Sequence, residues 1–206
     1  PNPTEEFYKP LKEVNEYKEF FKSDFFNIVF AGNIGEAQSF KTIIEAVNNI
    51  KELPVNVIVI GDGRYKKTAL NLIKEKGLEN HFNFLDSFPS TEMPKFFAHA
   101  DGLLVSLKKN KIFSLTIPAK IQSYLACAKP IIASIDGIGA KIVTDANCGV
   151  VSPAENMLVL SDRIKELMSL DKSKLYEMGM NSRTYYEKEF DRTYLLEKLE
   201  AILEDR

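Results

Sequence analysis

The chain has 206 residues, which allows one large α/β domain with an appendage and excludes two full catalytic domains. Hydrophobic residues make up 45% of the chain and charged residues 27%, so it can bury a sizeable core, and both intrinsic disorder and a disulfide-stapled miniprotein are excluded. The 27 Lys and Arg residues are balanced by 29 Asp and Glu residues, so no overall basic field is available to hold nucleic acid.

The sequence also limits where the chain works. No apolar run approaches the ~20 residues that span a bilayer, and the first residues are charged and mixed, so we predict neither a membrane helix nor a signal peptide. Cys127 and Cys148 lie too far apart for a C-x-x-C motif. We therefore expect small core side chains in a reducing cytoplasm rather than zinc or redox chemistry. The start at Pro1, without Met, indicates a fragment that lacks an N-terminal part.

The predicted elements begin with a polar lead over residues 1–26, in which Leu11–Phe21 is a candidate short helix. Apolar, β-branched runs then alternate with segments that carry apolar residues at helical spacing. The predicted strands, each with the helix that follows it, are 27–31 and 40–50, 56–60 and 64–76, 82–85 and 93–100, 102–107 and 118–128, 130–134 and 140–146, and 149–151 and 154–170. From Asp171 onward the pattern predicts helices alone, over 174–189 and 194–204.

This alternation predicts the fold class. Short strands that read as unbroken Val, Ile and Leu runs are buried on both faces, which is typical of parallel sheets. We therefore expect an α/β fold, with a Rossmann-like, doubly wound parallel sheet of six strands at 27–170 and a helical C-terminal tail at 171–206. Ligands of such sheets bind beyond the carboxyl ends of the strands.

One glycine-rich loop follows the first predicted strand. Gly32-Asn33-Ile34-Gly35 leads into a helix, so the backbone can approach a ligand closely and the helix N-terminus can offer free N–H groups to phosphate. The spacing matches neither G-x-G-x-x-G nor G-x-x-x-x-G-K-[ST]. A plain tight turn is the alternative interpretation.

Three junctions between a strand and the next helix carry cations. Arg64 follows Gly61-Asp62-Gly63, Lys120 lies in the first turn of the helix at 118–128, and Lys141 follows the turn at 136–139. A cation at a helix start opposes the helix dipole, and an anionic ligand would make both favourable. We therefore predict a diphosphate held jointly by these junctions, with solvated lysines as the alternative.

Two other loops are candidates for ligand contact. Ser87 and Phe88 follow the third predicted strand, where the ring would form one wall of a base pocket or, alternatively, cover the core. The loop 114–117, which contains Thr116, would present N–H groups to a leaving group. His81 and His99 have no acidic or cysteine neighbours in the sequence, so we expect structural roles for both.

Six blocks of sequence carry a family resemblance: NIVFAGNIG at 27–35, VIGDG at 59–63, ADGLLVS at 100–106, IPAKIQSYLACAKPIIAS at 117–134, DGIG at 136–139 and CGVVSP at 148–153. Their order and spacing resemble the donor-binding half of family 4 (group 1) glycosyltransferases of GT-B fold. The likeness covers about residues 1–200. It implies that 1–26 contains the linker between the two halves of such an enzyme, and that the tail from Tyr185 runs back to the N-terminal half.

The resemblance implies a set of site residues, position by position. The nucleotide sugar would be bound by Gly32, Asn33, Gly35, Gln38, Gly61, Asp62, Gly63, Arg64, Ser87, Phe88, Leu115, Gln122 and Ser123, and catalysis would involve Lys120 and Thr116.

This sequence departs from the family at four of these positions. The family's diphosphate-binding Arg and Lys fall on Asn33 and Gln38, and Lys120 and Arg64 are the candidates to replace them. The family's two glutamates fall on Leu115 and Ser123, which leaves Gln122 or Ser123 to contact the ribose hydroxyls.

By this resemblance we expect the donor-binding half of a retaining, hexosyltransferase-like enzyme of bacterial polysaccharide biosynthesis. It would use a nucleotide-diphosphate sugar, with UDP as the expected nucleotide, and neither a metal nor a resident cofactor. The missing N-terminal half would bind the acceptor, so the isolated domain would be inactive. The complete enzyme would be cytoplasmic, and peripheral association with the inner face of the membrane is left open.

Two alternatives remain. The chain could be a non-catalytic, transferase-like binding module that has lost the family's charged residues. A dinucleotide-dependent oxidoreductase domain would suit the sheet, but the missing G-x-G-x-x-G motif argues against it.

Overall fold

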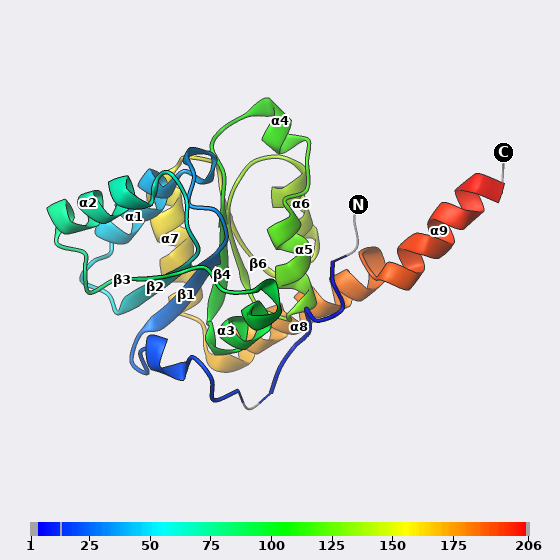
Figure 1. Ribbon diagram of the computed structural model, residues 1–206, viewed down its shortest axis with the longest axis horizontal. Coiled ribbons are helices and arrows are strands. Elements are labelled where there is room, and N and C mark those ends of the chain that lie inside the picture. Colours follow the sequence, from blue (N-terminus) through cyan, green and yellow to red (C-terminus); the bar gives the residue numbers. More distant parts are fainter. Residues whose placement is uncertain (1–3, 13, 205–206) are drawn as a thin grey trace.

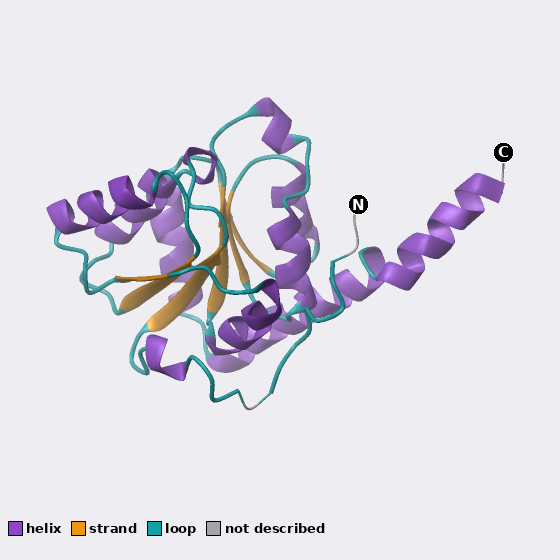
Figure 2. Ribbon diagram, in the orientation of Figure 1, coloured by secondary structure: helices purple, strands orange, loops and turns teal. Residues whose placement is uncertain are grey.

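A computed structural model describes residues 4–12 and 14–204. Residue 13 and the outermost parts of the predicted linker and tail, 1–3 and 205–206, lie outside the described residues. The described chain forms one sheet of six parallel strands with helices on both faces, and a last helix that extends away from this body (Figures 1 and 2). The predicted doubly wound α/β fold is confirmed.

The strands are β1 (Phe26–Ala31), β2 (Val55–Ile60), β3 (Phe82–Leu85), β4 (Gly102–Ser106), β5 (Ile131–Ser134) and β6 (Gly149–Ser152). They lie in the order β3-β2-β1-β4-β5-β6, and every neighbouring pair is parallel. The order reverses between β1 and β4, because the chain moves outward first on one side of β1 and then on the other. Such a reversal opens a ligand cleft at the carboxyl ends of the strands.

The helices are α1 (Phe40–Asn48), α2 (Lys66–Lys76), α3 (Met93–His99), α4 (Lys111–Ser114), α5 (Ala119–Ala126), α6 (Ile138–Asp145), α7 (Met157–Met168), α8 (Lys172–Glu189) and α9 (Arg192–Glu204). Three 3-10 turns lie at Lys18–Phe20, Glu36–Gln38 and Ser90–Glu92. The short helix α4 was not predicted. Asn110 caps it by accepting a hydrogen bond from the Ile112 N–H at 2.8 Å.

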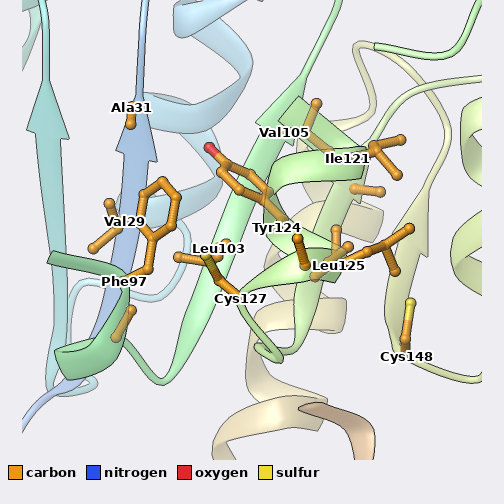
Figure 3. Packing of buried hydrophobic residues seen from close by; sticks show 14 of the residues in the cluster. Val29, Ala31, Phe97, Leu103, Val105, Ile121, Tyr124, Leu125, Cys127 and Cys148 are labelled. Atoms are coloured by element: carbon orange, nitrogen blue, oxygen red, sulfur yellow. The ribbon is translucent and has the colours of Figure 1, made fainter. Parts of the chain in front are cut away.

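Alternate side chains of each strand enter two separate cores. In β1, Val29 faces the core beneath α3, α5, α6 and α8, whereas Phe30 faces the core beneath α1, α2 and α7. Figure 3 shows the first core, in which the rings of Phe97 and Tyr124 meet edge to face with their centroids 5.2 Å apart. Cys127 and Cys148 form no disulfide and are buried in this core, as expected.

The lead before the sheet differs from the prediction. Within its described residues, the candidate helix Leu11–Phe21 is reduced to the 3-10 turn Lys18–Phe20. Contacts with α3 explain this, because Tyr17 stacks on Phe96 with ring centroids 4.0 Å apart and donates a hydrogen bond to Glu92 Oε2 at 2.8 Å. These contacts hold the lead against α3 instead of letting it coil on itself.

The tail begins by packing on the body. Arg183 Nη1 in α8 donates to the Ala126 carbonyl at 2.9 Å, and Ser182 Oγ donates to the Lys129 carbonyl at 2.8 Å. These contacts satisfy carbonyl groups at and beyond the end of α5. The helix α9 then projects away from the body (Figure 1). Among the described residues, no helix is both long and apolar enough to cross a membrane.

Candidate functional site

A cavity of about 520 Å³ lies between the carboxyl ends of β1, β2 and β3 and the start of α5. Its volume falls within the ~300–1,000 Å³ that is common for small-molecule sites. Eight of the predicted site residues line it: Gly32, Asn33, Gly61, Asp62, Ser87, Phe88, Lys120 and Ser123. The strand ends that the sequence indicated therefore share one cavity.

Two glycines form the narrow floor of this cavity. Gly61 has φ 139° and Gly32 has φ 126°, values that side chains rarely allow. A Cβ atom on Gly61 would overlap the Gly32 carbonyl oxygen, and a Cβ atom on Gly32 would lie 2.9 Å from Lys120 Cε. The glycines thus allow β1, β2 and the Lys120 side chain to meet closely.

The glycine loop offers fewer free N–H groups than expected. The N–H groups of Gly32, Ile34 and Gly35 already donate hydrogen bonds within the protein, at 2.8, 2.8 and 3.1 Å. The acceptor for Gly35 is the side chain of Gln38, which therefore holds the loop instead of lining the cavity. The Asn33 N–H has no acceptor among the described residues. The expected phosphate cradle is thereby reduced to one free N–H group in this loop.

The first turn of α5 provides a stronger anion site. Ala119 and Lys120 both line the cavity, and their backbone N–H groups find no acceptor in the described part of the chain. Unpaired N–H groups at a helix start carry the positive end of the helix dipole. This turn therefore favours a negatively charged ligand.

Lys120 is half-buried and lies across the edge of the sheet. Its Nζ atom lies 3.6 Å from the centroid of the Phe30 ring. Burial lowers the pKa of Lys120 to about 7, because loss of water disfavours the charged form. At neutral pH the side chain is therefore close to the balance between amine and ammonium, and a nearby anion would favour the ammonium form.

Apolar side chains form another part of the cavity lining. Phe88 lines the cavity and also meets Tyr17 and Phe96 edge to face, with ring centroids 5.4 and 5.0 Å apart. The ring therefore both covers the core and faces the cavity, and its contact with a base stays a prediction. Met93 and Phe97 of α3 continue this apolar lining, and their spacing of four residues places them on one face of that helix.

Seven predicted residues do not line the cavity: Gly35, Gln38, Gly63, Arg64, Leu115, Thr116 and Gln122. Leu115 is 64% exposed, whereas Gln122 is buried within the packed side of α5. Thr116 donates its hydroxyl hydrogen to the Phe113 carbonyl at 3.2 Å. A Cβ atom on Gly63 would overlap the Ile34 carbonyl, so this glycine lets two loops pack together instead of contacting a ligand.

The prediction of three converging cations is wrong. Lys120 lines the cavity, but Arg64 is exposed to solvent away from it. Lys141 is 73% exposed in its side chain and pairs with Asp145 one helical turn later, at 3.2 Å. Position at a helix start does not determine which way a side chain points, and these two point outward.

Sequence reasoning missed the part of the cavity that comes from the lead. Glu5 and Tyr8 line it, next to Ser123. Thr4 is 8% exposed and its Oγ1 atom lies 3.3 Å from Ser123 Oγ. No local sequence signal indicates this contact, because the two residues are 119 positions apart.

The two histidines have the structural roles that we expected. His81 Nδ1 lies 2.9 Å from the Val55 carbonyl, and His99 Nε2 lies 2.9 Å from the Glu16 carbonyl. Within the described ranges, no group of three or more His, Cys, Asp and Glu side chains is arranged to hold a metal ion.

Comparison with known protein families shows which family this chain belongs to. Residues 12–185, from the lead to α8, match the family model described as glycosyl transferases group 1. The chain belongs to this family. The resemblance of the six sequence blocks is thereby confirmed, and the matched range contains the sheet and most of the cavity lining.

Two curated relatives have full chains longer than this one. WcaI of Escherichia coli K12, named as a putative colanic acid biosynthesis glycosyl transferase, is 24% identical over 173 residues, which cover 82% of this chain and 40% of WcaI. The glycosyltransferase MJ1178 of Methanocaldococcus jannaschii, described as uncharacterized, is 25% identical over 161 residues, 78% of this chain and 43% of MJ1178. The chain thus spans less than half of these relatives.

Solved structures share the fold. Anabaena HepE in complex with UDP and glucose matches with a TM-score of 0.81 and 19% identity, over 97% of this chain and 54% of HepE. The C-terminal domain of LpcC from Francisella tularensis matches with a TM-score of 0.73 and 20% identity, over 90% of this chain and 97% of that domain. The chain therefore corresponds to one half of the GT-B fold.

Proposed function

We propose that the chain binds a nucleoside diphosphate sugar, with UDP as the nucleotide, for a retaining glycosyltransferase that acts on a glycan or a similar acceptor. The observation that carries this proposal is the first turn of α5, where two free N–H groups and Lys120 face a cavity of about 520 Å³. Membership of the group 1 family supports it. So does the shared fold with HepE, which was crystallised with UDP and with UDP-glucose.

The proposed chemistry builds up negative charge beside Lys120 and the first turn of α5. The bond between the anomeric carbon and the diphosphate oxygen breaks, and the diphosphate keeps the electron pair. The acceptor hydroxyl forms the new bond on the face from which the diphosphate leaves, and it gives its proton to the departing diphosphate oxygen. Lys120 and the N–H groups of Ala119 and Lys120 would stabilise the charge that develops on the diphosphate.

The rest of such an enzyme would supply the acceptor site. We expect an N-terminal half to bind the acceptor and to close over the donor, so the chain alone should bind donor without turning it over. The two cysteines form no disulfide, which suits a reducing cytoplasm, where we place the complete enzyme.

Calorimetric titration of the 206-residue chain with UDP, UDP-glucose and NAD tests this function. We expect UDP and UDP-glucose to bind and NAD to bind far more weakly. Lys120→Met should weaken UDP binding about tenfold, because a charge-assisted contact is lost. Lys141→Met is the matched control, since that lysine also follows a strand end but lies outside the cavity, and it should leave the affinity unchanged.

Two outcomes would contradict the proposal. No binding of UDP at millimolar concentration would favour the non-catalytic module, and tighter binding of NAD than of UDP would favour the oxidoreductase.

A further inference from the structure

The cavity contains one carboxylate that the proposed function has not used. Glu5, from the lead, lines the cavity, and no ion pair within the described chain involves it. A carboxylate can only accept hydrogen bonds. It therefore suits hydroxyl groups of a ligand and is unsuited to the phosphates, which are acceptors as well.

Contacts across the chain fix the residues on either side of Glu5, whose own side chain is exposed at the cavity. Thr4 Oγ1 lies 3.4 Å from Glu5 Oε2 and 3.3 Å from Ser123 Oγ, so the lead is joined to α5 at this point. Tyr8 lies on the other side of Glu5 in the sequence, and its ring is roughly parallel to that of Phe97 with centroids 6.4 Å apart. The carboxylate is thus placed by residues on both sides of it.

The environment of Tyr8 shows that Glu5, Tyr8 and Ser123 lie together in one corner of the cavity. Burial raises the pKa of the Tyr8 hydroxyl, the nearby negative charge of Glu5 raises it further, and the neighbouring Ser123 side chain acts in the opposite direction. Glu5, Tyr8 and Ser123 therefore lie close to one another at the cavity wall.

The position of this corner relative to Lys120 indicates what it would contact. Ser123 follows Lys120 by three residues in α5, and side chains at that spacing lie on one face, about 5–6 Å apart at Cβ. Phe88 and Met93 provide the apolar wall. A nucleotide with its phosphates at Lys120 and its base at that wall would carry its ribose past Glu5.

We propose that Glu5 accepts hydrogen bonds from the ribose hydroxyls of the bound nucleoside diphosphate. This inference rests on the proposed function, because it assumes that the cavity holds such a nucleotide. It assigns to the segment before the sheet a direct part in donor recognition. Sequence reasoning had assigned that contact to Gln122 or Ser123.

Comparison of UDP with 2′-deoxy-UDP by calorimetry tests the contact. The unmodified chain should bind UDP about tenfold more tightly, since a hydrogen bond to a charged group is lost in the deoxy compound. Glu5→Ala should weaken UDP binding about tenfold and 2′-deoxy-UDP binding much less, so that the preference for the ribose form largely disappears. The preference of Glu5→Gln for UDP over 2′-deoxy-UDP should lie between those of the unmodified chain and Glu5→Ala.

Glu6→Gln is the matched control, because Glu6 is an exposed carboxylate like Glu5 but does not line the cavity. It should keep both affinities, and thermal unfolding should confirm that all variants are folded. A preference for UDP that survives in Glu5→Ala would overturn the inference, as would an equal loss for both ligands, which a purely structural role would produce. In either case binding of UDP itself would leave the proposed function standing. Failure of the unmodified chain to bind UDP would instead refute both.

Discussion

Lys120 is the residue whose charge depends most on what occupies the cavity. Its Nζ atom lies over the Phe30 ring, and cation–π attraction offsets only part of what the ammonium loses by leaving water. Burial consequently lowers the pKa of Lys120 to about 7. A diphosphate beside it would raise that pKa again, because an opposite charge favours the protonated form.

This linkage predicts a pH dependence of binding. Below pH 7 Lys120 is already charged in the free chain, and its contribution to UDP affinity is fully present. Above pH 7 the free chain loses this proton, so binding must take it up again, and affinity should fall by up to about tenfold per pH unit. Calorimetry at pH 8 in buffers of different ionisation enthalpy should show uptake of about one proton.

Lys120→Met provides the comparison for this prediction. UDP's own ionisation is the same for both proteins, so the difference between them isolates the lysine. Equal proton uptake by the two proteins would contradict the assignment.

At the scale of elements, the helix α8 determines how the tail joins the body. Besides the hydrogen bonds from Ser182 and Arg183, the contact depends on the absence of a side chain at Gly179. A Cβ atom there would overlap the Ala128 carbonyl oxygen at the end of α5.

Gly179→Ala should therefore destabilise the chain despite the better helix propensity of alanine, which is worth about 1 kcal/mol. Forced separation of packed elements costs about 1–3 kcal/mol, so we expect a net fall in the free energy of unfolding. Met180→Ala, at the next and exposed position of the same helix, should change it by less than about 0.5 kcal/mol. Urea unfolding of both variants measures the difference, and a Gly179→Ala protein as stable as the unmodified chain would refute the close contact.

At the scale of the whole molecule, the sheet could be predicted because its signals are local. The predicted strand 82–85, which is apolar at both ends, has the same bounds as β3 in the structure. The lead could not be predicted in the same way. Residues 11–21 carry enough apolar side chains for a helix, but Tyr17 instead stacks on Phe96, which is distant in the sequence.

In the candidate site, too, the features with local sequence signals could be predicted and those that depend on distant contacts could not. The glycines at the strand ends are visible in the sequence because β1 and β2 must end at one edge, so Gly32 and Gly61 were placed correctly. The direction of a side chain on a helix depends on packing, which is why Lys141 points outward to Asp145. The contribution of Glu5 depends on the path of the lead across the molecule, and no pattern within the lead encodes it.

The central claim is that the first turn of α5 binds the diphosphate of a nucleotide sugar donor. A crystal structure of this chain with UDP tests it most directly. We predict the diphosphate within hydrogen-bonding distance of Lys120 Nζ and of the Ala119 and Lys120 N–H groups, with the uracil ring against Phe88. A diphosphate bound elsewhere, for example in the second cavity lined by Glu36 and Lys108, would contradict the account.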